Sequence, residues 1–163
     1  MSNGDKQPLL ACRNVFKYFG GLAAVNDFNL DVYPGDVVGI GGPNGAGKTT
    51  FLDVISGINP ATSGSILLGS VPIANKKPDA ICHLGISRTF QLNAGFESMS
   101  IRENTLVGAA FGLGDKGWFP RMTYNKLMHE RVDRALELCR LQDHADLIVR
   151  DLPVLDRKLL MMA

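Results

Sequence analysis

The sequence is poor in the residues that build disulfides and metal sites. It has three cysteines, Cys12, Cys82 and Cys139, and three histidines among 163 residues. The cysteines are far apart in the chain and none forms a CxxC pair, so neither a disulfide framework nor a zinc site is predicted. We expect the cysteines to be small, buried, apolar side chains in a reducing compartment.

Long apolar runs and an excess of one charge are also absent. No stretch approaches the roughly 18 consecutive apolar residues that a membrane span requires, and the polar start, residues 1–8, lacks the apolar centre of a signal peptide. Lysine and arginine number 17 against 16 aspartate and glutamate, a net charge of +1. Such a balance creates no general attraction to nucleic acid or to an acidic membrane. Any role at a membrane therefore requires a partner that supplies the spans.

Apolar residues make up 45% of the chain, enough for the core of one domain or most of one. Apolar runs punctuated by glycine and proline predict strands and short helices in the first half. The strands are expected at residues 9–19, 24–33, 37–40, 65–68 and 86–90, and the helices at 48–56 and 78–84. The run at 37–40 resembles a strand buried on both faces.

The pattern becomes helical after residue 91. Ser100 and Glu103 form a capping box, which predicts a helix that continues to about Ala110. A glycine-rich loop is expected over residues 111–121. A packing helix is expected over 124–140, where four residues fall on one face at helical spacing: Met128, Val132, Ala135 and Cys139.

The sequence GPNGAGKT at residues 42–49 fits the phosphate-binding pattern G-x-x-x-x-G-K-[ST]. Glycines allow the backbone to turn and direct its amides inward, and the start of a helix adds its positive dipole end. Lys48 would contact the β- and γ-phosphates, Thr49 would give Mg²⁺ a hydroxyl ligand, and Thr50 would bond the α-phosphate. The predicted binding residues are Gly42, Pro43, Asn44, Gly45, Ala46, Gly47, Lys48, Thr49 and Thr50.

The sequence disfavours two alternatives to an ATP site. A chance match in a glycine-rich turn is disfavoured by the strand expected before the loop and the helix expected after it. A GTPase would carry an N-K-x-D element that reads guanine. The nearest match, at residues 75–78, has Pro78 where the aspartate belongs. ATP with Mg²⁺ is therefore the predicted ligand.

The sequence GPNGAGKTT at residues 42–50, together with FKYFGGLAAV at residues 16–25, strongly resembles the ATP-binding cassette (ABC) family. The resemblance implies an α/β fold: a P-loop NTPase core with N-terminal antiparallel strands and a helical subdomain, incomplete at its C-terminus. It also implies that Phe19 packs on the adenine ring, although alone Phe19 would be interpreted as a core aromatic. Within the family, the phrases FGGL and RTFQ resemble the ATPase subunits of branched-chain amino-acid importers.

The segment GISRTFQ at residues 85–91 resembles the family's Q-loop. By that resemblance Gln91 would lie near Mg²⁺ and the attacking water, and would be a catalytic residue and metal ligand alongside Lys48 and Thr49. A lone glutamine is otherwise an ordinary surface residue. The resemblance divides the chain into a nucleotide-binding core (1–91), a helical subdomain (92–150) and a degenerate signature segment with the start of its helix (151–163).

Two features depart from a working ATPase of this family. The signature, roughly LSGGQ, is replaced here by LPVLD at residues 152–156, so that Val154 and Leu155 stand where glycines are expected. The family's Walker B strand, catalytic glutamate and switch histidine would follow Ala163, and the run LIVRD at 147–151 lies before the signature and lacks the glutamate. We expect a fragment or truncated product, whose missing part would add parallel strands beside the phosphate-loop strand.

The resemblance implies the ATPase subunit of an importer for branched-chain or other amino acids, which couples ATP binding and hydrolysis to transport. The implied partners are a membrane-spanning permease and a second ATPase subunit, with no nucleic acid, and the implied location is peripheral, on the cytoplasmic face of the membrane. The alternative is a nucleotide-binding module that does not hydrolyse ATP. For the 163 residues alone, binding with hardly any hydrolysis is expected.

Overall fold

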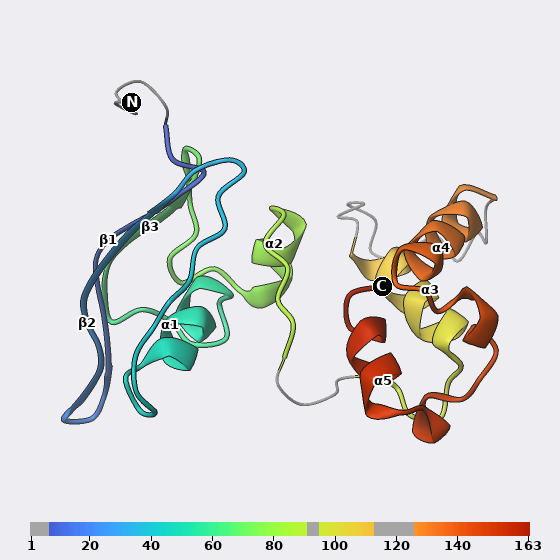
Figure 1. Cartoon of the computed structure of the whole chain (residues 1–163). Coiled ribbons are helices and arrows are strands. Elements are labelled where there is room, and N and C mark those ends of the chain that lie inside the picture. Colours follow the sequence, from blue (N-terminus) through green and yellow to red (C-terminus); the bar gives the residue numbers. More distant parts are fainter. Residues whose placement is uncertain (1–6, 91–94, 113–125) are drawn as a thin grey trace. The chain divides into compact units, whose positions relative to one another are not determined.

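The computed structural model describes residues 7–90, 95–112 and 126–163. They fall into two compact units, residues 1–87 and residues 88–163 (Figure 1). Gln91 and most of the predicted glycine-rich loop lie outside the described residues. The division of the chain at 91 and 150 stays a prediction.

The first unit contains an antiparallel sheet in the order β2-β1-β3-β4, and Figure 1 labels its three longer strands β1, β2 and β3. The strands are β1 (Leu10–Phe19), β2 (Leu22–Val32), β3 (Ser63–Leu68) and β4 (Val71–Pro72). Helix α1 (Lys48–Ile55) packs against β1 and β2. Helix α2 (Pro78–His83) begins with proline in its first turn and is followed by Gly85 at φ +103°, a residue suited to ending a helix. The predicted helices and the first, second and fourth predicted strands are confirmed.

The core of this unit lies between the sheet and α1. Phe51 of α1 is buried against Phe28 of β2, with ring centroids 3.9 Å apart. Cys12 is fully buried in the same cluster, and burial raises the pKa of its thiol to about 11. The expectation of a buried cysteine is therefore confirmed for Cys12 but is wrong for Cys82, which is exposed on α2, while Cys139 is half-buried.

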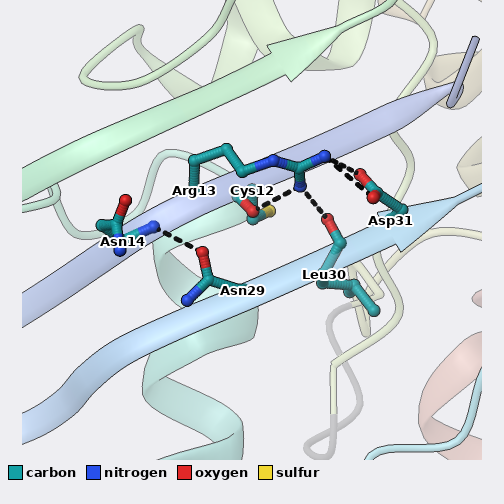
Figure 2. Close-up of polar contacts among 6 residues, drawn as sticks. All are labelled: Cys12, Arg13, Asn14, Asn29, Leu30 and Asp31. Carbon is teal, nitrogen blue, oxygen red and sulfur yellow. Dashed lines mark hydrogen bonds and ion pairs between the residues drawn. The ribbon is translucent and has the colours of Figure 1, made fainter.

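The outer face of the sheet carries a β-bulge, where Arg13 and Asn14 of β1 lie between the paired positions Cys12↔Leu30 and Val15↔Phe28. Figure 2 shows how side chains replace the lost ladder bonds: the Asn29 amide oxygen accepts from the Asn14 backbone N–H at 2.8 Å. The Arg13 guanidinium contacts both carboxylate oxygens of Asp31, at 2.6 and 2.8 Å. Side-chain contacts between β1 and β2 therefore bridge the bulge.

Two predicted strands are absent. Residues 37–40 and 86–90 form no strand, and Val37 is completely exposed. A strand buried on both faces needs a neighbour on each side to pair its amides and carbonyls. Among the described residues, the four strands of the sheet pair only with one another. The apolar pattern of these runs suits a strand, but within the described residues no neighbouring strand pairs with them.

The second unit is helical. Helix α3 (Ile101–Phe111) starts with the predicted capping box: Ser100 Oγ accepts from the Glu103 backbone N–H, and the Glu103 carboxylate accepts from the Ser100 N–H at 2.7 Å. Helix α4 (Lys126–Leu138) and helix α5 (Val154–Leu160) follow, with 3₁₀ turns at η1 (Gln142–His144) and η2 (Val149–Asp151). The apolar face predicted on α4 is confirmed by buried Val132, but Leu136, fully buried, was not among the residues identified.

The start of α3 is paired with a segment far along the chain. Ser100 and Ile148 form an antiparallel bridge. The Ile101 N–H donates to the Leu147 carbonyl at 3.0 Å, and the Val149 N–H donates to the Met99 carbonyl at 3.0 Å. Residues 147–151 therefore form a short antiparallel pairing followed by a 3₁₀ turn, and not a Walker B strand.

Candidate nucleotide-binding site

Lys48 is the first residue of α1 and folds back over the phosphate loop. Its ammonium donates to the carbonyl oxygens of Gly42 and Pro43, both at 2.7 Å. The first hydrogen bond at this helix start runs from the Phe51 N–H to the Gly47 carbonyl at 2.8 Å, and no side chain caps the helix. The amides before Phe51 therefore have no acceptor within the helix. Free amides, a helix dipole and an ammonium converge on one loop, which is the arrangement that favours an anion.

Gly47 is required for two separate reasons. Its backbone lies in the left-handed region, at φ +82°. A Cβ built there would also lie 2.0 Å from the Ala24 carbonyl oxygen of β2, closer than atoms can approach. Gly45 has a similar φ of +84° but no heavy atom within 4 Å of its Cβ position. The sequence pattern predicts a glycine at position 47 for the turn. The lack of space for a Cβ beside β2 is visible only in the structure.

These two glycines give a matched pair of substitutions. Gly45→Ala adds only backbone strain, about 1–2 kcal/mol. Gly47→Ala adds the same strain plus a clash with backbone, so the loop or β2 must move. We expect Gly47→Ala to lower the free energy of unfolding at least twice as much as Gly45→Ala, as measured by urea denaturation. Equal losses in the free energy of unfolding would show that β2 moves away at Ala24 with little cost.

A cavity of about 320 Å³ lies between the phosphate loop, β2 and α1. Ala24 and Val25 of β2 line one side, Gly45 and Gly47 line the loop side, and Lys48 belongs to the same lining. A space of this volume matches the smaller ligand sites of proteins. The loop thus faces a hollow in which one side is apolar and the other carries amides and a positive charge.

Phe19, the last residue of β1, is about half exposed. Its ring lies beneath the ammonium of Lys17, whose Nζ is 4.7 Å from the ring centroid. Tyr18, the neighbouring aromatic, has its ring stacked on Phe16, with centroids 6.2 Å apart and planes at 5°. Of these two adjacent aromatics, Tyr18 is therefore engaged with another ring, and Phe19 with a cation.

The replaced signature segment lies at the start of α5. Leu152 is buried, Pro153 caps the helix, and Val154 and Leu155 are exposed, at 65% and 66%. Two branched apolar side chains therefore project from the first turn, where a glycine backbone would have been bare. The Asp156 carboxylate lies 3.4 Å from His144 Nδ1.

The sequence model described as "ABC transporter" matches residues 25–158, which is most of the chain. The chain belongs to the ABC transporter family. The matched range contains the phosphate loop and the start of α5. Phe19 lies outside it, so the aromatic position depends on the resemblance of residues 16–25 and on the geometry just described.

Curated ABC transporter proteins give the same assignment. The chain is 36% identical over 163 residues to the "High-affinity branched-chain amino acid transport ATP-binding protein LivG" of Escherichia coli (strain K12), covering 96% of this chain and 64% of that protein. It is 35% identical over 144 residues to the "Probable branched-chain amino acid transport ATP-binding protein LivG" of Methanocaldococcus jannaschii, covering 84% of this chain and 55% of the relative. The chain thus spans about two thirds or less of these relatives.

Solved ABC transporter structures share the fold. The ADP conformation of MJ1267, an ATP-binding cassette of an ABC transporter, superposes with a TM-score of 0.81 at 31% identity, covering 95% of this chain and 63% of that one. A nucleotide-free ATP-binding cassette from an ABC transporter gives a TM-score of 0.76 at 31% identity, covering 95% of this chain and 66% of that one. The predicted α/β fold of this ABC ATPase type is therefore confirmed.

No helix within the described parts of the chain is both long enough and apolar enough to cross a bilayer. The residues predicted from the phosphate-loop pattern lie together on one loop and helix start. Gln91 cannot be placed beside them because it lies outside the described residues. Lys17 belongs to no sequence motif, and its contact with the Phe19 ring is visible only in the structure.

Proposed function

We propose that this chain is the nucleotide-binding part of an ABC importer ATPase subunit, for branched-chain or other amino acids. The observation that carries the proposal is the geometry of Lys48 and the loop from Gly42 to Thr49 at the start of α1. An ammonium 2.7 Å from two loop carbonyls is placed across the loop that would hold the phosphates. The 36% identity to a branched-chain amino-acid transport protein supports the transport role.

ATP would bind with its phosphates on the loop. The amides of Gly45, Gly47 and the first turn of α1 would surround the β-phosphate, and Lys48 would exchange its loop carbonyls for phosphate oxygens. Phe19 offers the half-exposed ring on which adenine would stack. Such stacking recognises a planar base without reading its edge.

The donor set at the start of α1 suits Mg²⁺. Thr49 is exposed there and would give the ion a hydroxyl oxygen, and Gln91 would give it an amide oxygen. Mg²⁺ prefers such hard oxygen donors and retains waters and phosphate oxygens as its other ligands. When bound, the ion would neutralise charge on the phosphates.

The proposed location is peripheral, on the cytoplasmic face of the membrane. The partners are a membrane-spanning permease and a second ATPase subunit. Residues 98–150 would contact the permease. In the second unit, large apolar side chains are exposed on its surface: Phe96, Phe111, Leu138 and Leu147.

A specific observation favours the second candidate function, a nucleotide-binding module without hydrolysis. Val154 and Leu155 project from the first turn of α5. In a closed dimer that turn would lie against the partner subunit's γ-phosphate, and these side chains would keep the two apart. The module would bind ATP but would not complete the hydrolytic site.

Site-specific photo-crosslinking tests the permease contact. A photoreactive residue is placed at Phe111 or Leu138 in the helical unit, or at Leu22 or Val37 in the first unit as exposed controls. In membranes that contain the permease, we expect cross-links from the helical positions and none from the controls. Cross-links confined to residues 1–80 would refute the proposed docking.

A further inference from the structure

Lys17 is a buried cation beside the candidate nucleotide site. Its exposed fraction is 8%, which is unusual for a lysine. Among the described residues, no carboxylate forms an ion pair with it. The contact recorded for its ammonium is the face of the Phe19 ring, with Nζ 4.7 Å from the centroid. A buried charge needs compensation, and here an aromatic face supplies it.

The strand pairing places Lys17 next to the candidate nucleotide cavity. Lys17 of β1 lies directly opposite Val25 of β2. Residues directly opposite each other in an antiparallel pair have their side chains on the same face of the sheet. Val25 is buried and lines the cavity beside the phosphate loop. The side chain of Lys17 therefore belongs to the face of the sheet that carries the candidate site.

We infer that Lys17 is a positioning residue for the nucleotide base, acting through Phe19. An ammonium over one face of the ring restricts its rotation and leaves the half-exposed ring with its other face available to a planar base. This inference rests on the proposed function, because it takes adenine as the ligand of Phe19. Lys17 would contact the face of the Phe19 ring opposite the base and would touch neither the base nor the phosphates.

Two ligands, measured in parallel, separate the contribution of the base to affinity from that of the phosphates. Mg-ATP uses both Phe19 and the phosphate loop, whereas inorganic triphosphate with Mg²⁺ uses the loop alone. Calorimetric affinities for both ligands are measured on the full chain and on the variants Lys17→Met, Lys17→Arg, Phe19→Ala and Tyr18→Ala, and on the double variant Lys17→Met/Phe19→Ala. Methionine retains the length of the side chain without the charge, and arginine retains a cation able to lie over a ring. Circular dichroism confirms that each variant is folded.

We expect Lys17→Met to weaken Mg-ATP about threefold to tenfold, in line with the strength of a partly desolvated cation–π contact. Triphosphate affinity should not change, Lys17→Arg should restore ATP binding, and Lys17→Met should have no further effect when Phe19 is already alanine. Tyr18→Ala should leave both ligands unchanged, since its ring stacks on Phe16.

Three results would overturn the inference alone: unchanged ATP affinity in Lys17→Met, equal losses for ATP and triphosphate, or a full effect that persists without the Phe19 ring. Failure of the proposed base site would be visible separately. In that case the unmodified chain would bind ATP no more tightly than triphosphate, or Phe19→Ala would weaken both ligands equally. Either result would remove adenine from Phe19 and the inference with it.

Discussion

Lys48→Ala is expected to weaken Mg-ATP binding about tenfold to a hundredfold. A hydrogen bond between a charged donor and its acceptor is worth about 1.5–3 kcal/mol, which corresponds to that range of affinity. The ammonium now lies 2.7 Å from the Gly42 and Pro43 carbonyls. When phosphate binds, the ammonium must exchange these two hydrogen bonds for bonds to phosphate oxygens. The net loss of affinity in Lys48→Ala should therefore fall toward the lower end of the range.

The measurement is calorimetric titration with Mg-ATP and, separately, with inorganic triphosphate. Because Lys48 is proposed to contact the phosphates, both ligands should lose affinity by the same factor. Lys126→Ala is the matched control, because that side chain is 93% exposed on α4 and, within the described parts of the chain, its ammonium has an ion pair only with Glu130, at 3.9 Å. Equal ATP affinity in Lys48→Ala and the unmodified chain would contradict the assignment of the phosphate loop.

The second large effect is an absence of turnover: the 163-residue chain is expected to bind ATP and hardly hydrolyse it. Hydrolysis needs a group that accepts the proton of the attacking water and others that stabilise the transferred phosphoryl. The sequence has no Asp-Glu pair after an apolar strand. Each missing catalytic group costs on the order of 10²–10⁴ in rate. An amide such as that of Gln91 is a poor base and cannot replace them.

Steady-state phosphate release by the purified chain with Mg-ATP checks this expectation. The rate should equal that of Lys48→Ala, which retains the fold but loses the phosphate contact. Release well above that control, and proportional to protein concentration, would show that hydrolysis proceeds without the expected groups. In the variant Val154→Gly/Leu155→Gly we expect no recovery, because those residues are proposed to hinder dimer closure and would take no part in the chemistry itself.

The local elements were predictable because their causes are local. The capping box at Ser100 and Glu103 is formed entirely within four residues, and it is present as predicted. The phosphate loop likewise contains its own glycines, lysine and helix start. The resemblance to the ABC family depends on the phosphate loop and other short segments, because their sequences are distinctive.

The missed features depend on distant partners. Val37 was expected inside a strand but is fully exposed, because strand formation depends on neighbours that no local pattern specifies. Val154 and Leu155 were recognised as unusual from the sequence, but their exposure on the first turn of α5 required the fold. Lys17 was missed for the same reason: its importance lies in the contact with Phe19 and in the register with Val25.

The pairing between Ser100 and Ile148 has a consequence for how the second unit folds. The two residues are 48 positions apart, so bringing them together has an entropic free-energy cost of about 3.4 kcal/mol beyond a constant. Helices usually form from local contacts and fold early. Here the Ile101 N–H in the first turn of α3 donates to the Leu147 carbonyl. That hydrogen bond forms only after residues 147–149 have packed beside the start of α3. The unit should therefore fold cooperatively, with slower kinetics than its helical content suggests.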